Sequence, residues 1–280
     1  MYPEAIAQLR CPRHTTIPLE LQPNAAYDNQ GAIRNGILHC PHCHKRYPIR
    51  DGIADLLGFL AFPSSMTQLA NGIPLTAWAY ERHWRYRALP LLSGEPLGYE
   101  RELPLITGLL DPTQPGIYLD IACSNGLYAR AIANVCTNHG GHVIGIDHAL
   151  PMLKQARICA QQQGLRISYI RAKAQRLPFA HHSIMGVAMG GALNEIGNAD
   201  KALREVARVL TPHGRFVLMN LIAAESALGR SAQRLLKSGG VTFWSQRQLN
   251  ERLAAAGFRL RAQWRYRIVL FSLLNISAPT

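Results

Sequence analysis

From residue 116 onward, short apolar runs alternate with amphipathic segments. The apolar runs predict strands at 117–122, 143–147, 167–171, 184–189, 216–220, 259–266 and 268–274. Between them, apolar residues recur every three or four positions, which predicts helices at 127–136, 151–162, 199–210 and 246–256. Asn198 or Asp200 is suited to begin the third of these helices, and Gly257 to end the last. This alternation is typical of a mostly parallel sheet covered by helices on both faces, so we predict an α/β fold.

The first 112 residues follow a different pattern. Short strand-like pieces surround the first cysteines, and a stretch poor in charge at 64–78 predicts a linker. Helical spacing returns at 76–92, where aromatic residues form a cluster typical of packing; these are Trp78, Tyr80, Trp84 and Tyr86. We predict three parts: a small domain over 1–60, a linker with helices over 61–112, and the main domain over 113–280.

The composition is that of a folded globular protein. Hydrophobic residues make up 48% and charged residues 17% of the 280-residue chain, with no low-complexity tract. The apolar run at 268–274 is too short to cross a bilayer, and the N-terminal residues lack the apolar core of a signal peptide. We therefore expect no transmembrane segment and a cytoplasmic location.

The net charge of +13 is concentrated in the C-terminal half. Residues 113–220 carry eleven Lys or Arg against five Asp or Glu, and residues 221–280 carry nine against two. The segment 225–244, which we expect to be helical, contributes three of these cations. A basic face could attract RNA or an anionic lipid surface. Solubility and a solvated helix face explain the same charges at least as well.

Three cysteines lie within the first 43 residues, in a chain whose expected location disfavours disulfides. Cys11 and His14 form one closely spaced pair, and Cys40 and Cys43 form a second pair after 25 intervening residues. Two such pairs on two turns supply the tetrahedral ligands of a structural Zn²⁺. Histidines at positions 42 and 44 compete with His14 as the fourth ligand. We expect zinc, and a metal-free domain with packed thiols is the alternative.

The cysteine frame and the sequence YPIRDGI at 47–53 resemble a small zinc-ribbon family over about 60 residues. Members of that family occur as activating partners of nucleic-acid and protein methyltransferases and as fused N-terminal modules. The resemblance raises the question of what the rest of the chain does.

A turn of very small residues, Ala122 to Gly126, joins the first predicted strand of the main domain to a helix. Small residues let the backbone N–H groups at the helix start approach a ligand closely. Asp147 ends the second strand about twenty residues later, where its carboxylate can accept hydrogen bonds from both hydroxyls of a ribose. The two features together predict a nucleoside site more specifically than a small-residue turn by itself.

These residues resemble the first motif, D-x-G-x-G-x-G, of the class I S-adenosylmethionine-dependent methyltransferases. The matching positions are Asp120, Ala122, Ser124 and Gly126, followed by Asp147, by Leu177–Phe179 and by the stretch 205–214. The resemblance runs from about Tyr80 to the C-terminus. It implies a Rossmann-like seven-stranded sheet with an antiparallel last strand, a lid from the preceding helix, and S-adenosylmethionine as cofactor. It places Asp120 at the methionine amine, Asp147 at the ribose, and Cys123, Lys173 and Ala174 along the cofactor.

The chain departs from the motif at three positions. Ala122 and Ser124 replace two glycines, and we expect backbone strain at Ala122 and a milder effect at Ser124. Lys173 stands where relatives carry an aspartate that accepts a hydrogen bond from the adenine amino group, which lysine cannot do. The backbone of Ala174 can still contact adenine, so we expect weakened binding. Cys123 is expected to fill space.

The resemblance implies direct displacement of a methyl group, in which positioning and exclusion of water supply most of the rate. The acceptor would lie above the ends of the fourth and fifth strands, at Asn194, Glu195 and Asn220. We predict that Asn194 and Glu195 orient or deprotonate it, with a loop-capping role as the alternative. A small or lipophilic, quinone-like acceptor is favoured. An rRNA guanine-N1 methyltransferase and a non-catalytic protein with a degenerate cofactor pocket are the alternatives.

Overall fold

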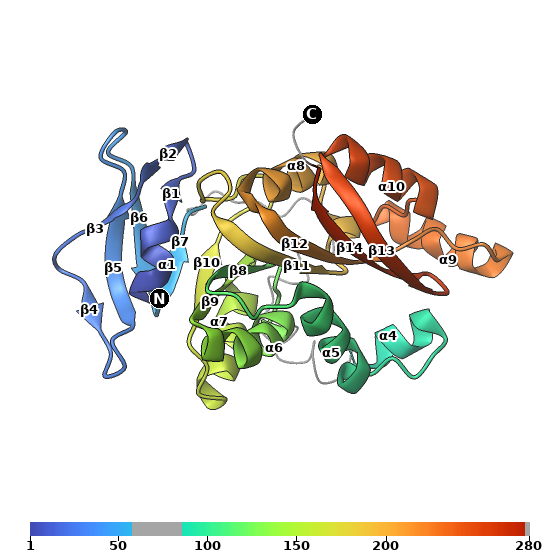
Figure 1. Cartoon of the computed structure of the whole chain (residues 1–280), viewed down its shortest axis with the longest axis horizontal. Helices are drawn as coiled ribbons and strands as arrows, with labels where there is room; N and C mark the ends of the chain where they lie inside the picture. Colours follow the sequence, from blue (N-terminus) through green and yellow to red (C-terminus); the bar gives the residue numbers. More distant parts are fainter. Residues whose placement is uncertain (58–85, 278–280) are drawn as a thin grey trace.

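The computed structural model describes residues 1–57 and 86–277 (Figure 1). Seven strands form the main-domain sheet: β8 (Gly116–Ile121), β9 (Gly141–Asp147), β10 (Ile167–Arg171), β11 (Ile184–Gly190), β12 (Leu210–Leu221), β13 (Phe258–Tyr266) and β14 (Val269–Ile276). Their order across the sheet is β13-β14-β12-β11-β8-β9-β10. β14 runs antiparallel between β12 and β13, and the other neighbours are parallel. The predicted fold and its antiparallel last strand are confirmed.

Helices cover both faces of this sheet (Figure 1). One face carries α5 (Tyr99–Leu110), α6 (Leu127–Cys136) and α7 (Leu150–Gln162), and the other carries α8 (Ala199–Val209) and α10 (Gln246–Ala255). In β8, Tyr118 belongs to the buried cluster under α5, α6 and α7, whereas Leu119 belongs to the cluster under α8 and α10. Because successive side chains of a strand point to opposite faces, this strand is buried on both sides.

Some boundaries differ from the sequence prediction. β12 begins at Leu210 instead of 216, because Leu210 already pairs with Ile184 ahead of an irregularity in the register. The helix predicted over 225–244 is α9 (Ala227–Ser238); it ends before Gly239 and Gly240, the second of which has a φ of +91°, and Trp244 forms a bridge with Ile222. Two short 3-10 turns, Thr137–His139 and Leu193–Glu195, complete the main domain.

The helix predicted at 76–92 is described from α4 (Tyr86–Ser93) onward. The predicted linker and the aromatic residues Trp78, Tyr80 and Trp84 lie outside the described residues. No helix within residues 1–57 and 86–277 has the length and apolarity to cross a bilayer. The cytoplasmic location stays a prediction.

The N-terminal residues extend the same sheet. After α1 (Pro3–Gln8) come β1 (Arg10–Cys11), β2 (His14–Pro18), β3 (Glu20–Leu21), β4 (Ala26–Tyr27), β5 (Ile33–His39), β6 (Arg46–Arg50) and β7 (Ile53–Asp55). β7 pairs parallel with β10, and β6, β5 and β3 continue the sheet antiparallel. Leu9 and Tyr47 lie in the same buried cluster as Phe179 of the main domain. The N-terminal module thus shares a sheet and a core with the main domain, while the predicted domain boundaries stay a prediction.

Candidate functional site

Three residues in the turn between β8 and α6 have a left-handed backbone. Their φ angles are +54° at Ala122, +50° at Ser124 and +77° at Gly126. Backbone strain is present at Ala122 as expected, and Ser124 has the same left-handed backbone; the milder effect expected at Ser124 stays a prediction. At Gly126 a Cβ would lie 2.9 Å from the Tyr169 hydroxyl and 3.1 Å from the Ala156 Cβ. Glycine is therefore required there by both backbone and space.

Asp147 ties this turn to the end of β9. Its Oδ2 accepts the Ser124 backbone N–H at 2.8 Å, and its Oδ1 accepts that of Ala149 at 2.8 Å. The Nδ1 of His148 lies 3.4 Å from Oδ1, and the buried Nε2 of that ring has no hydrogen-bond partner among the described residues. A carboxylate oxygen accepts about two hydrogen bonds. Asp147 therefore keeps capacity to accept a further hydrogen bond, at Oδ2 at least.

Asp120 is buried beneath the same turn, with 2% of its surface exposed. Its Oδ2 accepts the backbone N–H of Ala129 in the first turn of α6, at 2.8 Å. Burial raises the pKa of Asp120 to about 7; the bond from Ala129 opposes the rise and the Asp147 charge adds to it. A ligand cation bound here would favour the charged forms of both carboxylates. Burial also raises the pKa of the Cys123 thiol, which supports a space-filling role.

Lys173 and Ala174 lie in the turn that follows β10. The Lys173 side chain is exposed, whereas Ala174 packs against the core cluster. The backbone N–H of Ala172 donates to the Asp147 carbonyl at 3.0 Å. This bond holds the turn at the carboxyl edge of the sheet, the same edge that carries the turn at 122–126. The side chain of Lys173 supplies no hydrogen-bond acceptor there.

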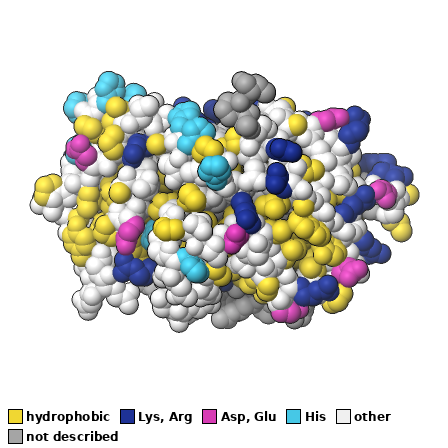
Figure 2. All heavy atoms as spheres, in the orientation of Figure 1, with side chains coloured by type: hydrophobic (Ala, Val, Ile, Leu, Met, Phe, Trp, Pro, Cys, Tyr) yellow, Lys and Arg dark blue, Asp and Glu magenta, His cyan; other side chains and the backbone are white. Residues whose placement is uncertain are grey.

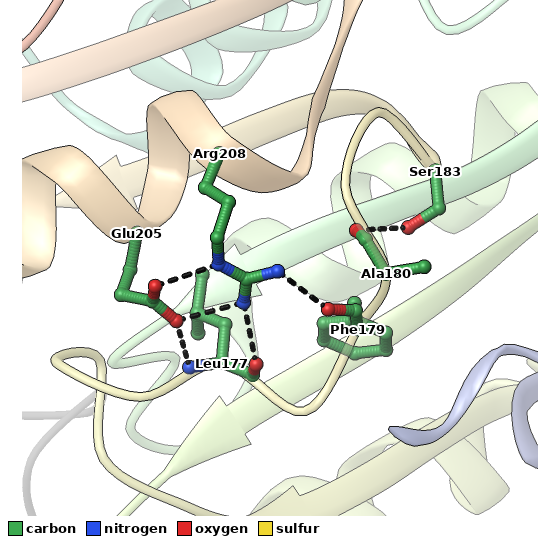
Figure 3. Close-up of polar contacts among 6 residues, drawn as sticks. All are labelled: Leu177, Phe179, Ala180, Ser183, Glu205 and Arg208. Carbon is green, nitrogen blue, oxygen red and sulfur yellow. Dashed lines mark hydrogen bonds and ion pairs between the residues drawn. The ribbon is translucent and has the colours of Figure 1, made fainter. Parts of the chain in front are cut away.

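A network around Arg208 of α8 holds the loop that follows this turn (Figure 3). The Arg208 guanidinium donates to the carbonyls of Phe179 at 2.7 Å and Leu177 at 2.9 Å, and to both oxygens of Glu205 at 2.7 and 2.8 Å. Glu205 also accepts the Leu177 backbone N–H at 2.8 Å. The motif resemblance found in the sequence includes 177–179 and 205–214, but it assigns no role to Glu205 or Arg208. Their contacts show that the two stretches form one unit.

The N-terminal module contacts the site at two points. The backbone N–H of Arg10 donates to the Pro178 carbonyl at 2.8 Å, next to a bridge between Leu9 and Phe179. The second contact runs through Arg171 at the end of β10, which pairs with Asp55 of β7. Sequence reasoning missed both contacts because they join segments far apart in the chain.

Asn194 has its side-chain amide occupied by backbone groups. Its Nδ2 donates to the carbonyls of Leu221 at 2.8 Å and Thr242 at 2.6 Å, and its Oδ1 accepts the Leu221 N–H at 3.0 Å. Both donor positions are therefore used. The geometry favours the structural alternative for Asn194, which joins the end of β12 to the segment after α9.

Glu195, the next residue, has a different environment. Its side chain is partly buried, and burial followed by the Asp147 charge raises its pKa to about 7. Glu195 follows β11, which runs parallel to β8, so it lies at the same carboxyl edge of the sheet as the turn at 122–126. A carboxyl group with a pKa near neutrality is suited to accept a proton during catalysis.

The four residues predicted to bind metal converge in the N-terminal module. The ligand atoms of Cys11, His14, Cys40 and Cys43 all lie within 4.8 Å of one another. Cys11 Sγ is 3.7 Å from His14 Nδ1 and 3.8 Å from Cys43 Sγ. His42, a competing candidate, stacks edge-on against the His14 ring instead. The group could hold a metal ion, and His14 is the histidine that completes it.

Residues 119–218 match the family described as "Methyltransferase domain". The match covers 100 of the 280 residues. The matched stretch contains Asp120, Asp147 and Glu195, together with the turn between β8 and α6.

Relatives of known sequence cover part of the chain. An uncharacterized chloroplastic methyltransferase of Arabidopsis thaliana is 29% identical over 211 residues, which are 71% of this chain and 58% of its own length. The demethylmenaquinone methyltransferase of Thermus thermophilus is 34% identical over 105 residues, 38% of this chain and 47% of its own length. The chain thus spans roughly half the length of these relatives.

Solved structures share the fold at low sequence identity. The [4+2]-cyclase SpnF superposes with a TM-score of 0.62 at 17% identity, covering 79% of this chain and 99% of that one. A chain from the complex between the Haloferax volcanii Trm112 methyltransferase activator and a methyltransferase gives 0.56 at 18% identity, covering 78% and 100%. Because a cyclase shares this fold, the chemistry has to be argued from the site.

Proposed function

We propose that this chain transfers the methyl group of S-adenosylmethionine to a small, lipophilic, quinone-like acceptor. One arrangement carries the proposal: the left-handed turn at 122–126 lies over Asp120 and Asp147, and Glu195 follows β11 at the same carboxyl edge of the sheet. The match of residues 119–218 to a methyltransferase domain supports the reaction type.

The residues present fit this cofactor. Asp120 and Asp147 offer negative charge to a ligand that carries an ammonium and a sulfonium group. Asp147 retains acceptor capacity for a ribose hydroxyl, and the buried Nε2 of His148 is without a partner among the described residues. Ala174 supplies backbone and apolar contact at the adenine end, where Lys173 points to solvent. When bound, the cofactor supplies an electrophilic methyl group on positively charged sulfur.

Glu195 is the residue we assign to the acceptor. Transfer of the methyl group to the acceptor would leave the electron pair of the carbon–sulfur bond on sulfur. The proton released by the acceptor passes to the Glu195 carboxylate, whose pKa of about 7 suits that step. Relatives named as demethylmenaquinone and 2-phytyl-1,4-naphtoquinone methyltransferases support a quinone-like acceptor.

We infer that Cys11, His14, Cys40 and Cys43 hold a structural Zn²⁺. Three thiolates and an imidazole are a preferred zinc ligand set, and no further position is needed to complete four-coordination. Burial would raise the pKa of Cys11, but hydrogen bonds from Tyr47, from His14 and from the backbone outweigh it and lower the pKa to about 6. The thiolate form of Cys11 is therefore favoured, whereas burial raises the pKa of Cys40.

Calorimetry with S-adenosylmethionine and with its demethylated product tests the cofactor assignment. We expect the wild type to bind both ligands, Asp147→Asn to bind at least tenfold more weakly, and Asp111→Asn, an exposed acid paired with Arg215, to bind normally. Methyl transfer from labelled cofactor to a prenylated naphthoquinol, compared with rRNA fragments, tests the acceptor. If neither S-adenosylmethionine nor its demethylated product binds at millimolar concentration, the enzyme function is rejected. If only RNA becomes labelled, the quinone-like acceptor is rejected.

A further inference from the structure

Helix α9 lies almost wholly outside the body of the protein. Its twelve residues are exposed except for Gly229 and Gln233, which are partly covered. Three leucines are among the most exposed apolar residues described: Leu228 at 86%, Leu235 at 77% and Leu236 at 53%. Figure 1 shows the helix at the end of the molecule beside β13 and α10. A surface helix normally turns its leucines toward the core, so three exposed leucines on one helix form an apolar surface that the described residues leave uncovered.

The apolar and basic residues of α9 lie on opposite faces. Helical spacing of four and seven places Leu228, Ala232 and Leu235 on one face. The same spacing places the three cations, Arg230, Arg234 and Lys237, on the other. Short apolar and basic faces on one exposed helix are the features of a helix that lies in the interface of a membrane.

A narrow strip of α9, separate from its apolar and basic faces, attaches the helix to the rest of the protein. The Gln233 side chain donates to the Ile222 carbonyl at 3.0 Å and accepts the Ala224 N–H at 2.8 Å. At Gly229 a Cβ would lie 2.7 Å from the Ala224 Cβ, so the helix approaches the body closely at this point. The attachment leaves the leucines and the cations uncovered.

The two segments that flank α9 lie next to the proposed acceptor site. These segments are paired, with the Ala223 N–H donating to the Trp244 carbonyl at 2.8 Å. Asn194 fastens the same two segments through Leu221 and Thr242. Because Glu195 directly follows Asn194, α9 stands at the rim of the place where the acceptor would bind.

The charge around α9 favours an anionic partner. Within residues 1–57 and 86–277, none of Arg230, Arg234 and Lys237 forms an ion pair, and the nearby Glu225 pairs with Arg265 at 2.6 Å. Figure 2 shows Lys and Arg gathered at the end of the molecule that carries α9. A second copy of this chain would bring like charges together. An acidic surface with an apolar layer beneath it complements both faces.

We propose that α9 docks this protein on an anionic phospholipid membrane. The leucine face enters the boundary between headgroups and acyl chains, and the cations contact lipid phosphates. The inference rests on the proposed function, because a lipophilic acceptor dissolved in that membrane would reach Glu195 by passing the two segments that flank α9. The helix lies on the bilayer and does not span it.

Sedimentation with vesicles tests the docking in the absence of cofactor and acceptor. We expect the full chain to bind vesicles of equal parts phosphatidylglycerol and phosphatidylcholine, more weakly as salt rises, and to bind pure phosphatidylcholine at least tenfold more weakly. The double variant L228Q/L235Q should lose at least tenfold in binding. The triple variant R230Q/R234Q/K237Q should lose about a hundredfold. Since all five side chains are exposed, these variants should melt at the wild-type temperature.

Matched controls keep the result specific. I158Q changes an apolar residue of α7 that is 44% exposed, and R247Q removes an exposed cation of α10; both should bind vesicles normally. Wild-type binding by L228Q/L235Q, or equal binding to neutral and anionic vesicles, would overturn the proposal. So would a dimer that the leucine variant abolishes. Loss of cofactor binding in calorimetry with vesicle binding intact would reject the enzyme function instead, so the two failures are distinguishable.

Discussion

The guanidinium of Arg171 lies 3.0 Å from the carboxylate of Asp55, at the seam where β10 pairs with β7. The same guanidinium donates through Nε to the carbonyl of His148, the residue after Asp147, at 3.0 Å. The two charged side chains are 16% and 18% exposed, so water screens the pair incompletely. The N-terminal module is thereby joined to the ribose end of the proposed cofactor site.

Asp55→Asn should weaken both folding and cofactor binding. The change removes one carboxylate partner from a partly buried guanidinium, and we expect a loss of about 1–3 kcal/mol in unfolding free energy, with several-fold weaker cofactor binding. Denaturant unfolding and calorimetry measure the two effects. Asp51→Asn is the control, since Asp51 pairs with Arg34 at 3.9 Å on the surface and should change stability by less than about 0.5 kcal/mol. Equal behaviour of the two variants would contradict the assigned role.

Arg208→Lys should destabilise the loop at 177–179. Lysine keeps the charge but lacks the planar fork that reaches Glu205 and both loop carbonyls. We expect a loss of about 2–4 kcal/mol in unfolding free energy, because partly buried carbonyls lose their donors. Arg204→Lys, one turn away and exposed, should be neutral. Hydrogen exchange at 177–179 that stays at the wild-type rate in Arg208→Lys would argue against the network.

The strands around the site were predictable because β8, β9 and β10 are mostly apolar, as strands buried on both faces of a parallel sheet must be. The ends of helix α5 were not predicted from the sequence, because Pro104 within the helix lacks a backbone N–H donor and interrupts the helical pattern. The role of Asn194 could not be predicted either. Its partners Leu221 and Thr242 are 27 and 48 residues away, and only the folded chain brings their backbone groups to its amide.

Gly126→Ala should destabilise the fold through steric overlap as well as through backbone strain. Gly164 provides the comparison, because its φ is +67° and a Cβ there would meet nothing within 4 Å. At both positions, alanine would have to adopt a left-handed backbone, which lowers the free energy of unfolding by about 1–2 kcal/mol. Gly126→Ala should cost roughly 1–3 kcal/mol more, because its Cβ overlaps Tyr169 and Ala156. Thermal unfolding separates the two, and equal losses would show that the turn relaxes around the added methyl group.

Cys40→Ser should release the metal of the N-terminal module. One zinc per chain is expected in the purified wild type by atomic emission, and we expect Cys40→Ser to retain less than a tenth of it and to melt at lower temperature. Cys136→Ser replaces an equally buried cysteine outside the cluster and should keep full zinc. Full zinc content in Cys40→Ser would remove that residue from the ligand set.

Glu195 should make stability and rate depend on pH in opposite directions. Its folded pKa of about 7 lies above the ordinary value of 4.5, so the folded chain holds the proton more tightly than the unfolded chain. The resulting stabilisation is fully present below pH 4.5 and is lost as the pH rises through about 7. Glu195→Gln, which mimics the protonated form, should therefore exceed the wild type by on the order of 2 kcal/mol at pH 8 and converge with it near pH 4.5.

The rate should follow the other protonation state. Wild-type methyl transfer should rise with pH through about 7 as the Glu195 carboxylate forms, whereas Glu195→Gln should be about 10²–10⁴-fold slower and flat over the same range. Glu251→Gln, an exposed acid of α10, is the control and should leave both profiles unchanged. If Glu195→Gln kept the wild-type pH dependence of the rate, another group would accept the proton, and the carboxyl of Glu195 would serve the acceptor by shape and polarity alone.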